Sequence, residues 1–119
     1  MKFILTESAI KRAISKYLDK KDFIILDMGK TFNNYIYLYN SSDDEVAQIC
    51  VYTTNAIGEK RNWVFVTYYL IEEISEFFTI DREIALDIIG DWVGEKLSIT
   101  PKRVEDARKE GNYRLIIEK

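Results

Sequence analysis

The chain has 119 residues, 47% of them hydrophobic and 31% charged, and its formal net charge is −3. This composition is typical of globular proteins and excludes intrinsic disorder, and the length predicts one domain over residues 1–119. We find neither a signal peptide nor an apolar stretch near the roughly 20 residues that cross a membrane, so we expect a soluble protein of the cytoplasm.

The first half of the chain predicts a helix followed by strands. Apolar residues recur at helical spacing between Glu7 and Leu18. A compact apolar stretch from Asp22 to Asp27 predicts a strand, and Gly29 marks the turn after it. Three further strands are predicted at residues 34–40, 45–54 and 63–67. Short polar connections separate the four predicted strands, which favours an antiparallel meander.

Residues 68–97 predict a pair of helices. The apolar side chains between Leu70 and Phe78 fall on one helical face. Residues 79–81 interrupt this pattern, and Asp81 is the predicted N-cap of the second helix, where its carboxylate would accept a backbone N–H bond. The second helix then runs to about Leu97, and its wide apolar arc predicts contact with more than one neighbour.

The last 20 residues carry weaker patterns. Thr100 and Pro101 match the cap and first residue of a short helix, which Gly111 would end. Residues 113–118 then resemble a strand. The sequence as a whole predicts an α+β fold: an N-terminal helix, an antiparallel sheet of about four strands, a helix pair and a C-terminal strand.

Four carboxylates recur at every fourth position of the second predicted helix: Glu83, Asp87, Asp91 and Glu95. Like charges at this spacing destabilise a helix by about 0.2–0.5 kcal/mol per pair. One interpretation is an acidic ridge that meets a basic partner, with Gly90 and Gly94 allowing a close approach. The alternative is a solvated helix face whose glycines serve packing inside the protein.

Charge is distributed unevenly along the chain. Residues 1–21 carry six Lys or Arg and two acids, whereas residues 72–95 carry one cation and eight acids. The basic ends of the chain could lie against the acidic helices and offset their charge. Otherwise the acidic segment forms a surface for a basic partner.

Tyr35, Tyr37 and Tyr39 alternate along one predicted strand and therefore share one face. Tyrosine is enriched at protein interfaces because a rigid apolar ring carries a polar tip. The alternative is that helices cover this face and the rings belong to the core. Lys30 is the single basic residue between positions 22 and 57, which disfavours a nucleic-acid partner for this face.

The residue types exclude several kinds of active site. The chain has no histidine, which excludes Ser-His-Asp and Cys-His pairs and His-bound zinc. Cys50 is the only cysteine and lies in an apolar run, which predicts a buried thiol and no disulfide. The scattered glycines match no phosphate-binding loop. We therefore predict no catalytic residues, no metal ligands and no cofactor.

The opening residues 1–8 (MKFILTES), followed by a basic amphipathic helix, resemble the start of many small proteins encoded by tailed bacteriophages. The length and a β-rich middle followed by acidic helices are similar too. Ala9 stands where those openings often have glutamine. Because most of those proteins have no assigned function, the resemblance implies a phage-encoded accessory protein in the host cytoplasm and no site residues.

These observations favour a non-enzymatic protein-binding domain. One alternative is an acidic inhibitor that mimics nucleic-acid charge against a basic nuclease or regulator, and another is a divalent-metal-dependent enzyme that uses the acidic helix. Nucleic-acid binding through the basic ends would require these ends to lie side by side. The partner's identity and the oligomeric state stay open. The predicted partner-binding residues are Tyr35, Tyr37, Tyr39, Glu83, Asp87, Asp91 and Glu95.

Overall fold

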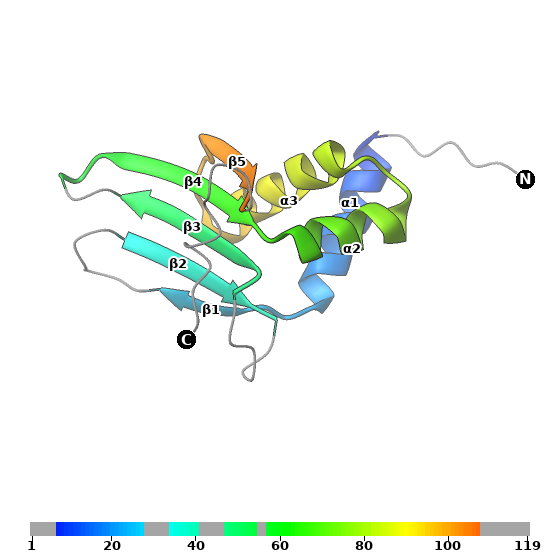
Figure 1. Cartoon of the computed structure of the whole chain (residues 1–119), viewed down its shortest axis with the longest axis horizontal. Helices are drawn as coiled ribbons and strands as arrows, with labels where there is room; N and C mark the ends of the chain where they lie inside the picture. Colours follow the sequence, from blue (N-terminus) through cyan, green and yellow to red (C-terminus); the bar gives the residue numbers. More distant parts are fainter. Residues whose placement is uncertain (1–6, 28–33, 41–46, 55–56, 108–119) are drawn as a thin grey trace, which may run out of the picture.

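The computed structural model describes residues 7–27, 34–40, 47–54 and 57–107. These residues form three helices and five strands, which confirms the predicted α+β class (Figure 1). In chain order the elements are α1 (Glu7–Lys20), β1 (Ile24–Asp27), β2 (Asn34–Tyr39), β3 (Ile49–Thr54), β4 (Lys60–Val66), α2 (Tyr68–Phe78), α3 (Arg82–Leu97) and β5 (Arg103–Asp106).

The five strands lie side by side in chain order, from β1 at one edge to β5 at the other. Strands β1 to β4 pair antiparallel, as expected for a meander. Strand β5 pairs parallel to β4, with Trp63 opposite Arg103 and Val66 opposite Asp106, so the sheet is mixed. A parallel return requires a long crossover, and α2 and α3 supply it.

The expected short helix from Pro101 is wrong, because residues 103–106 form strand β5 instead. The N–H of Lys102 donates to the C=O of Asn62 at 2.9 Å, just before the two strands begin to pair. Pairing with β4 thus overrides the local helix-start pattern. The predicted strand at residues 113–118 lies outside the described residues.

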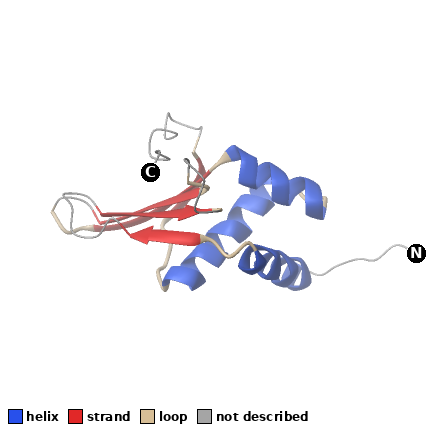
Figure 2. Ribbon diagram, turned by 90° about the horizontal axis from the view of Figure 1, so that it is seen from below, coloured by secondary structure: helices blue, strands red, loops and turns tan. Residues whose placement is uncertain are grey.

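The sheet has two different faces because successive side chains on a strand alternate. One face packs against the helices, which Figure 2 shows gathered at one end of the strands. Its buried residues include Leu38, Ile49, Val51, Val64 and Val66. The opposite face carries a second buried cluster: Tyr37, Tyr39, Ala47, Cys50, Phe65 and Ala107. The predicted burial of the Cys50 thiol is confirmed, with 0% of the residue exposed.

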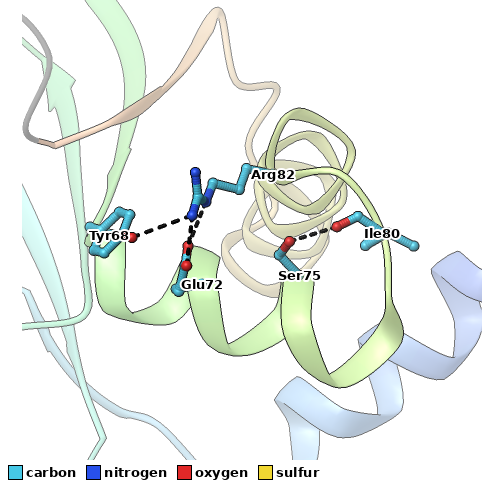
Figure 3. A network of polar contacts seen from close by, with 5 residues as sticks. All are labelled: Tyr68, Glu72, Ser75, Ile80 and Arg82. Carbon is cyan, nitrogen blue, oxygen red and sulfur yellow. Dashed lines mark hydrogen bonds and ion pairs between the residues drawn. The ribbon is translucent and has the colours of Figure 1, made fainter.

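The two helices of the crossover are fixed to each other by polar contacts (Figure 3). Arg82, the first residue of α3, donates two hydrogen bonds to the carboxylate of Glu72 in α2, at 2.5 and 2.7 Å. Its guanidinium also donates to the Tyr68 hydroxyl at 3.4 Å. In the last turn of α2, the Ser75 hydroxyl donates to the C=O of Ile80, in the connection to α3, at 2.6 Å. Two-point arginine–carboxylate bonds fix direction as well as distance.

The helix starts differ in how they are capped. Thr67 caps α2, and its hydroxyl oxygen accepts the N–H of Leu70 at 3.4 Å. Asp81 occupies the N-cap position of α3 as predicted, but its carboxylate accepts no capping bond. The expected side-chain bond is therefore wrong, and α3 begins with the backbone bond from Ala85 N–H to Asp81 C=O at 3.0 Å.

Candidate functional site

The four repeated carboxylates of α3 are all exposed. The opposite arc of the helix is buried against the sheet and α1, and it includes Ala85, Ile88, Ile89, Trp92 and Val93. Since four residues advance a helix by slightly more than one turn, the carboxylates follow a spiral instead of a straight line. This spiral divides them between different hollows on the surface.

A hollow of about 530 Å³ lies between the start of α1, α3 and β5. We refer to it as the acidic groove. Three carboxylates and three apolar side chains share its lining, and Lys11 is the one cation among the described residues that line it. The lining residues are Glu7, Ser8, Lys11, Ile84, Asp87, Ile88, Asp91 and Val104.

A second hollow of about 250 Å³ continues from the acidic groove toward the end of α3. It shares Lys11 and Asp91 with the groove, and it adds the carboxylate of Glu95. The fold therefore brings Asp87, Asp91 and Glu95 into one region. Glu83 instead lines a separate hollow between α2 and α3.

Lys11 lies among these carboxylates and pairs with one of them. Its Nζ is 3.1 Å from Oδ2 of Asp91, and both side chains are about half exposed. The pKa of Lys11 is raised by the hydrogen bond and charge of Asp91, and further by the charges of Glu95 and Glu7. Three different acids thus act in the same direction on this one amine, so the charges around Lys11 are mainly negative.

Gly90 and Gly94 do not open a path for a partner. A Cβ built on Gly90 would lie 2.5 Å from Val104, and one built on Gly94 would lie 2.9 Å from Pro101. Strand β5 fills the space beside Gly90, and the residues that lead into this strand fill the space beside Gly94. This confirms the alternative in which the glycines serve packing inside the protein.

The three tyrosines of β2 lie on the sheet face away from the helices, and they differ in exposure. Tyr37 is 4% exposed and Tyr39 is 1% exposed, whereas Tyr35 is half-buried. Burial raises the pKa of all three hydroxyls. The expected contact surface is therefore wrong for Tyr37 and Tyr39, which are core residues. Helices are not the cause of their burial, because the helices pack on the other face.

An aromatic row crosses the far end of this face, and it includes Tyr52, which the sequence suggested could lie beside the tyrosines of β2. The rings of Tyr52 and Trp63 stack with centroids 5.8 Å apart. The guanidinium groups of Arg61 and Arg103 lie 5.3 and 4.7 Å from the Trp63 ring. Arg103 comes from β5, so only the parallel strand brings the two arginines together. Alternation on β2 predicted the tyrosines, but no local pattern indicated the arginines.

The described part of the chain holds no group of three His, Cys, Asp or Glu side chains arranged to bind a metal ion. No described helix is long and apolar enough to cross a membrane. No protein family, no curated protein and no solved structure was found to match the chain. The resemblance to phage proteins stays a prediction, and function has to be inferred from the geometry.

Proposed function

We propose that this chain is a non-enzymatic protein-binding domain whose acidic groove receives a basic, partly apolar segment of a partner protein. The supporting observation is the composition of one hollow: the carboxylates of Glu7, Asp87 and Asp91 line it together with apolar side chains. Ile84, which lines the groove, is 44% exposed. A phage-encoded accessory protein that acts on a host or viral protein is one setting for such a domain.

The groove matches an amphipathic segment better than it matches a flat charged surface. Helix-in-groove recognition uses apolar anchors at helical spacing and polar groups around them. Here Ile84 offers an exposed apolar side chain on α3, and half-buried Val104 joins it from β5, whereas Ile88, one turn from Ile84, is buried. Charge complementarity would guide the approach of a Lys- or Arg-bearing segment, and the apolar contacts would hold it.

A peptide titration followed by NMR tests the groove directly. The probe is a helical peptide with Leu on one face and Lys on the other, added to isotope-labelled protein. We expect shifts at Ile84, Ile88 and Val104, and binding that weakens as salt rises. The double variant Asp87→Asn/Asp91→Asn should bind roughly fivefold to tenfold more weakly, if each exposed charge contributes about 0.5–0.7 kcal/mol, within the usual range of about 0.2–1 kcal/mol.

The matched control removes two charges outside the groove. Glu76→Gln/Glu83→Gln changes the net charge equally, and both residues line the separate hollow between α2 and α3. Its affinity for the peptide should stay within twofold of the wild type. An equal loss in both double variants would contradict the groove and indicate non-specific attraction.

Charge mimicry is the second candidate, because all four carboxylates of α3 are exposed along one helix at a rise of about 6 Å per step. It predicts that Glu83→Gln alone weakens binding to a basic nuclease or regulator as much as Asp91→Asn does. The metal-enzyme alternative finds less support, since acid–base carboxylates are typically desolvated in a pocket. A thermal shift on adding Mg²⁺ or Mn²⁺ would favour it.

A further inference from the structure

The two edges of the sheet differ in chemistry. Strand β5 carries charged side chains at three of its four positions, Arg103, Glu105 and Asp106. Charged side chains on an edge strand are a common protection against pairing with another chain. Strand β1, at the other edge (Figure 1), has no such protection at its first three positions. These positions are Ile24, Ile25 and Leu26, and each is 41% exposed.

The backbone of β1 is open to a further strand at Ile25. Leu38 lies opposite Ile25 in the antiparallel β1–β2 pair. The C=O of Leu38 accepts the N–H of Gln48 at 2.8 Å, so the backbone groups of Leu38 point toward β3, away from β1. In an antiparallel ladder, the residue opposite such a position also directs its N–H and C=O away from its partner. Ile25 therefore directs both groups outward from the sheet edge.

We propose that β1 is a dimerisation strand that pairs antiparallel with β1 of a second copy, with the two-fold axis at Ile25. The outward N–H of each Ile25 then donates to the outward C=O of the partner's Ile25. Ile24 of each copy lies opposite Leu26 of the other, on the sheet face away from the helices. The two five-stranded sheets become one continuous sheet.

The order of residues along β1 explains why a second copy fits this edge. Antiparallel self-pairing about Ile25 places the apolar residues of the two copies opposite one another. Asp27 of each copy then lies opposite Phe23 of the other, so no like charges lie directly opposite. A parallel partner copy would place like ends together. The charged side chains of β5 disfavour strand pairing at the other edge of the sheet. Association through β1 therefore stops at two copies instead of growing into a fibre.

The pairing is independent of the proposed function, since the acidic groove lies at the β5 side of the molecule. The peptide-binding test of the acidic groove and the dimerisation test of β1 can therefore fail independently of each other. Three apolar side chains and one short strand bury less than the roughly 800 Å² per partner of a standard interface. We accordingly expect a Kd between about 10 μM and 1 mM, which corresponds to weak association.

Sedimentation and light scattering over a concentration series test the dimer. The molar mass of the wild type should rise from 14.0 kDa toward twice that value as the concentration approaches about 1 mM. Ile25→Lys and Ile25→Pro should stay at 14.0 kDa at all concentrations. Proline removes only the outward N–H, so the β1–β2 bonds and the circular dichroism spectrum should be retained.

Ile57→Lys is the matched control, because Ile57 is 84% exposed and lies outside β1. This variant should dimerise like the wild type. A short bis-maleimide should cross-link Ile25→Cys but not Asp27→Cys, whose copies would be separated by about 14 Å along the strands. A wild-type chain that is monomeric at about 1 mM would overturn the proposal. Retained dimerisation in folded Ile25→Lys would overturn it as well.

Discussion

Gly90 of α3 faces Val104 of β5, and the missing side chain at Gly90 leaves the room that Val104 occupies. A Cβ built on Gly90 would lie 2.5 Å from Cγ2 and 2.8 Å from Cγ1 of Val104. Distances this short essentially never occur between a Cβ and a non-bonded atom, so any larger residue at position 90 would force the Val104 side chain, or the strand that carries it, to shift. Val104 also lines the acidic groove. The contact therefore sets both the place of the parallel edge strand and the shape of the candidate site.

Gly90→Ala should lower the free energy of unfolding by about 1–2 kcal/mol, which a urea titration would measure. Alanine is the better helix former by about 1 kcal/mol, but overpacking costs about 1–3 kcal/mol and the clash with Val104 is severe. The double variant Gly90→Ala/Val104→Ala should recover part of the loss, because a smaller side chain at position 104 makes room. If Gly90→Ala were as stable as the wild type, the position of β5 would not depend on the contact between Gly90 and Val104.

The helices and most strands were predictable because their patterns are local. The bounds of α3 at Arg82 and Leu97 agree with the prediction, because the break at residues 79–81 marks where the helix begins. Strands β2, β3 and β4 were expected within a few residues of their observed ends. The two-residue alternation of β2 correctly placed its tyrosines on the opposite face from Ile36 and Leu38.

Strand β5 was not predictable from local patterns. Its partner β4 lies about 40 residues earlier, on the other side of two helices. The Thr100–Pro101 pair carries a helix-start pattern, and only pairing with β4 overrides it. Local patterns also could not predict every residue of the acidic groove. The repeat on α3 revealed Asp87, Asp91 and Glu95, but Glu7 joins them from α1 through helix packing that no spacing encodes.

Thr79 ends α2 in the left-handed conformation, with φ at 53°, and its side chain is exposed. This conformation costs an L-residue roughly 1–2 kcal/mol, and glycine avoids the cost. Because glycine also loses more entropy on folding, Thr79→Gly should raise the free energy of unfolding by about 0.5–1 kcal/mol in a urea titration. Thr100→Gly, at an exposed position without positive φ, is the control and should give no gain.

The hydroxyl of Tyr17 donates a 2.5 Å hydrogen bond to Glu73, and this bond, with partial burial, raises the pKa of Tyr17 to about 12. A phenol whose pKa is higher in the folded state stabilises the fold below its ordinary pKa near 10. That stability is lost as pH rises from about 10 through 12. Tyr17→Phe should therefore make the free energy of unfolding fall less steeply over this interval.

Glu73→Gln provides the matched variant for this measurement. It removes the charged acceptor, so an ultraviolet difference titration should show the pKa of Tyr17 returning toward its ordinary value. Other tyrosines on the sheet also have raised pKa values, so the slope should be reduced and not abolished. An unchanged slope in Tyr17→Phe would contradict the assigned role of this hydrogen bond.

Lys11 limits the negative field of the acidic groove, because it pairs with Asp91 at 3.1 Å. Lys11→Gln should free that carboxylate and strengthen binding of the Leu- and Lys-bearing peptide by roughly twofold to fivefold at low salt, with a smaller gain at high salt. NMR titration would measure both affinities. Lys16→Gln removes an equal charge from an exposed position of α1 that does not line the groove. If both variants bound the peptide equally well, the gain would reflect net charge alone, whereas a gain confined to Lys11→Gln would locate the peptide beside Asp91.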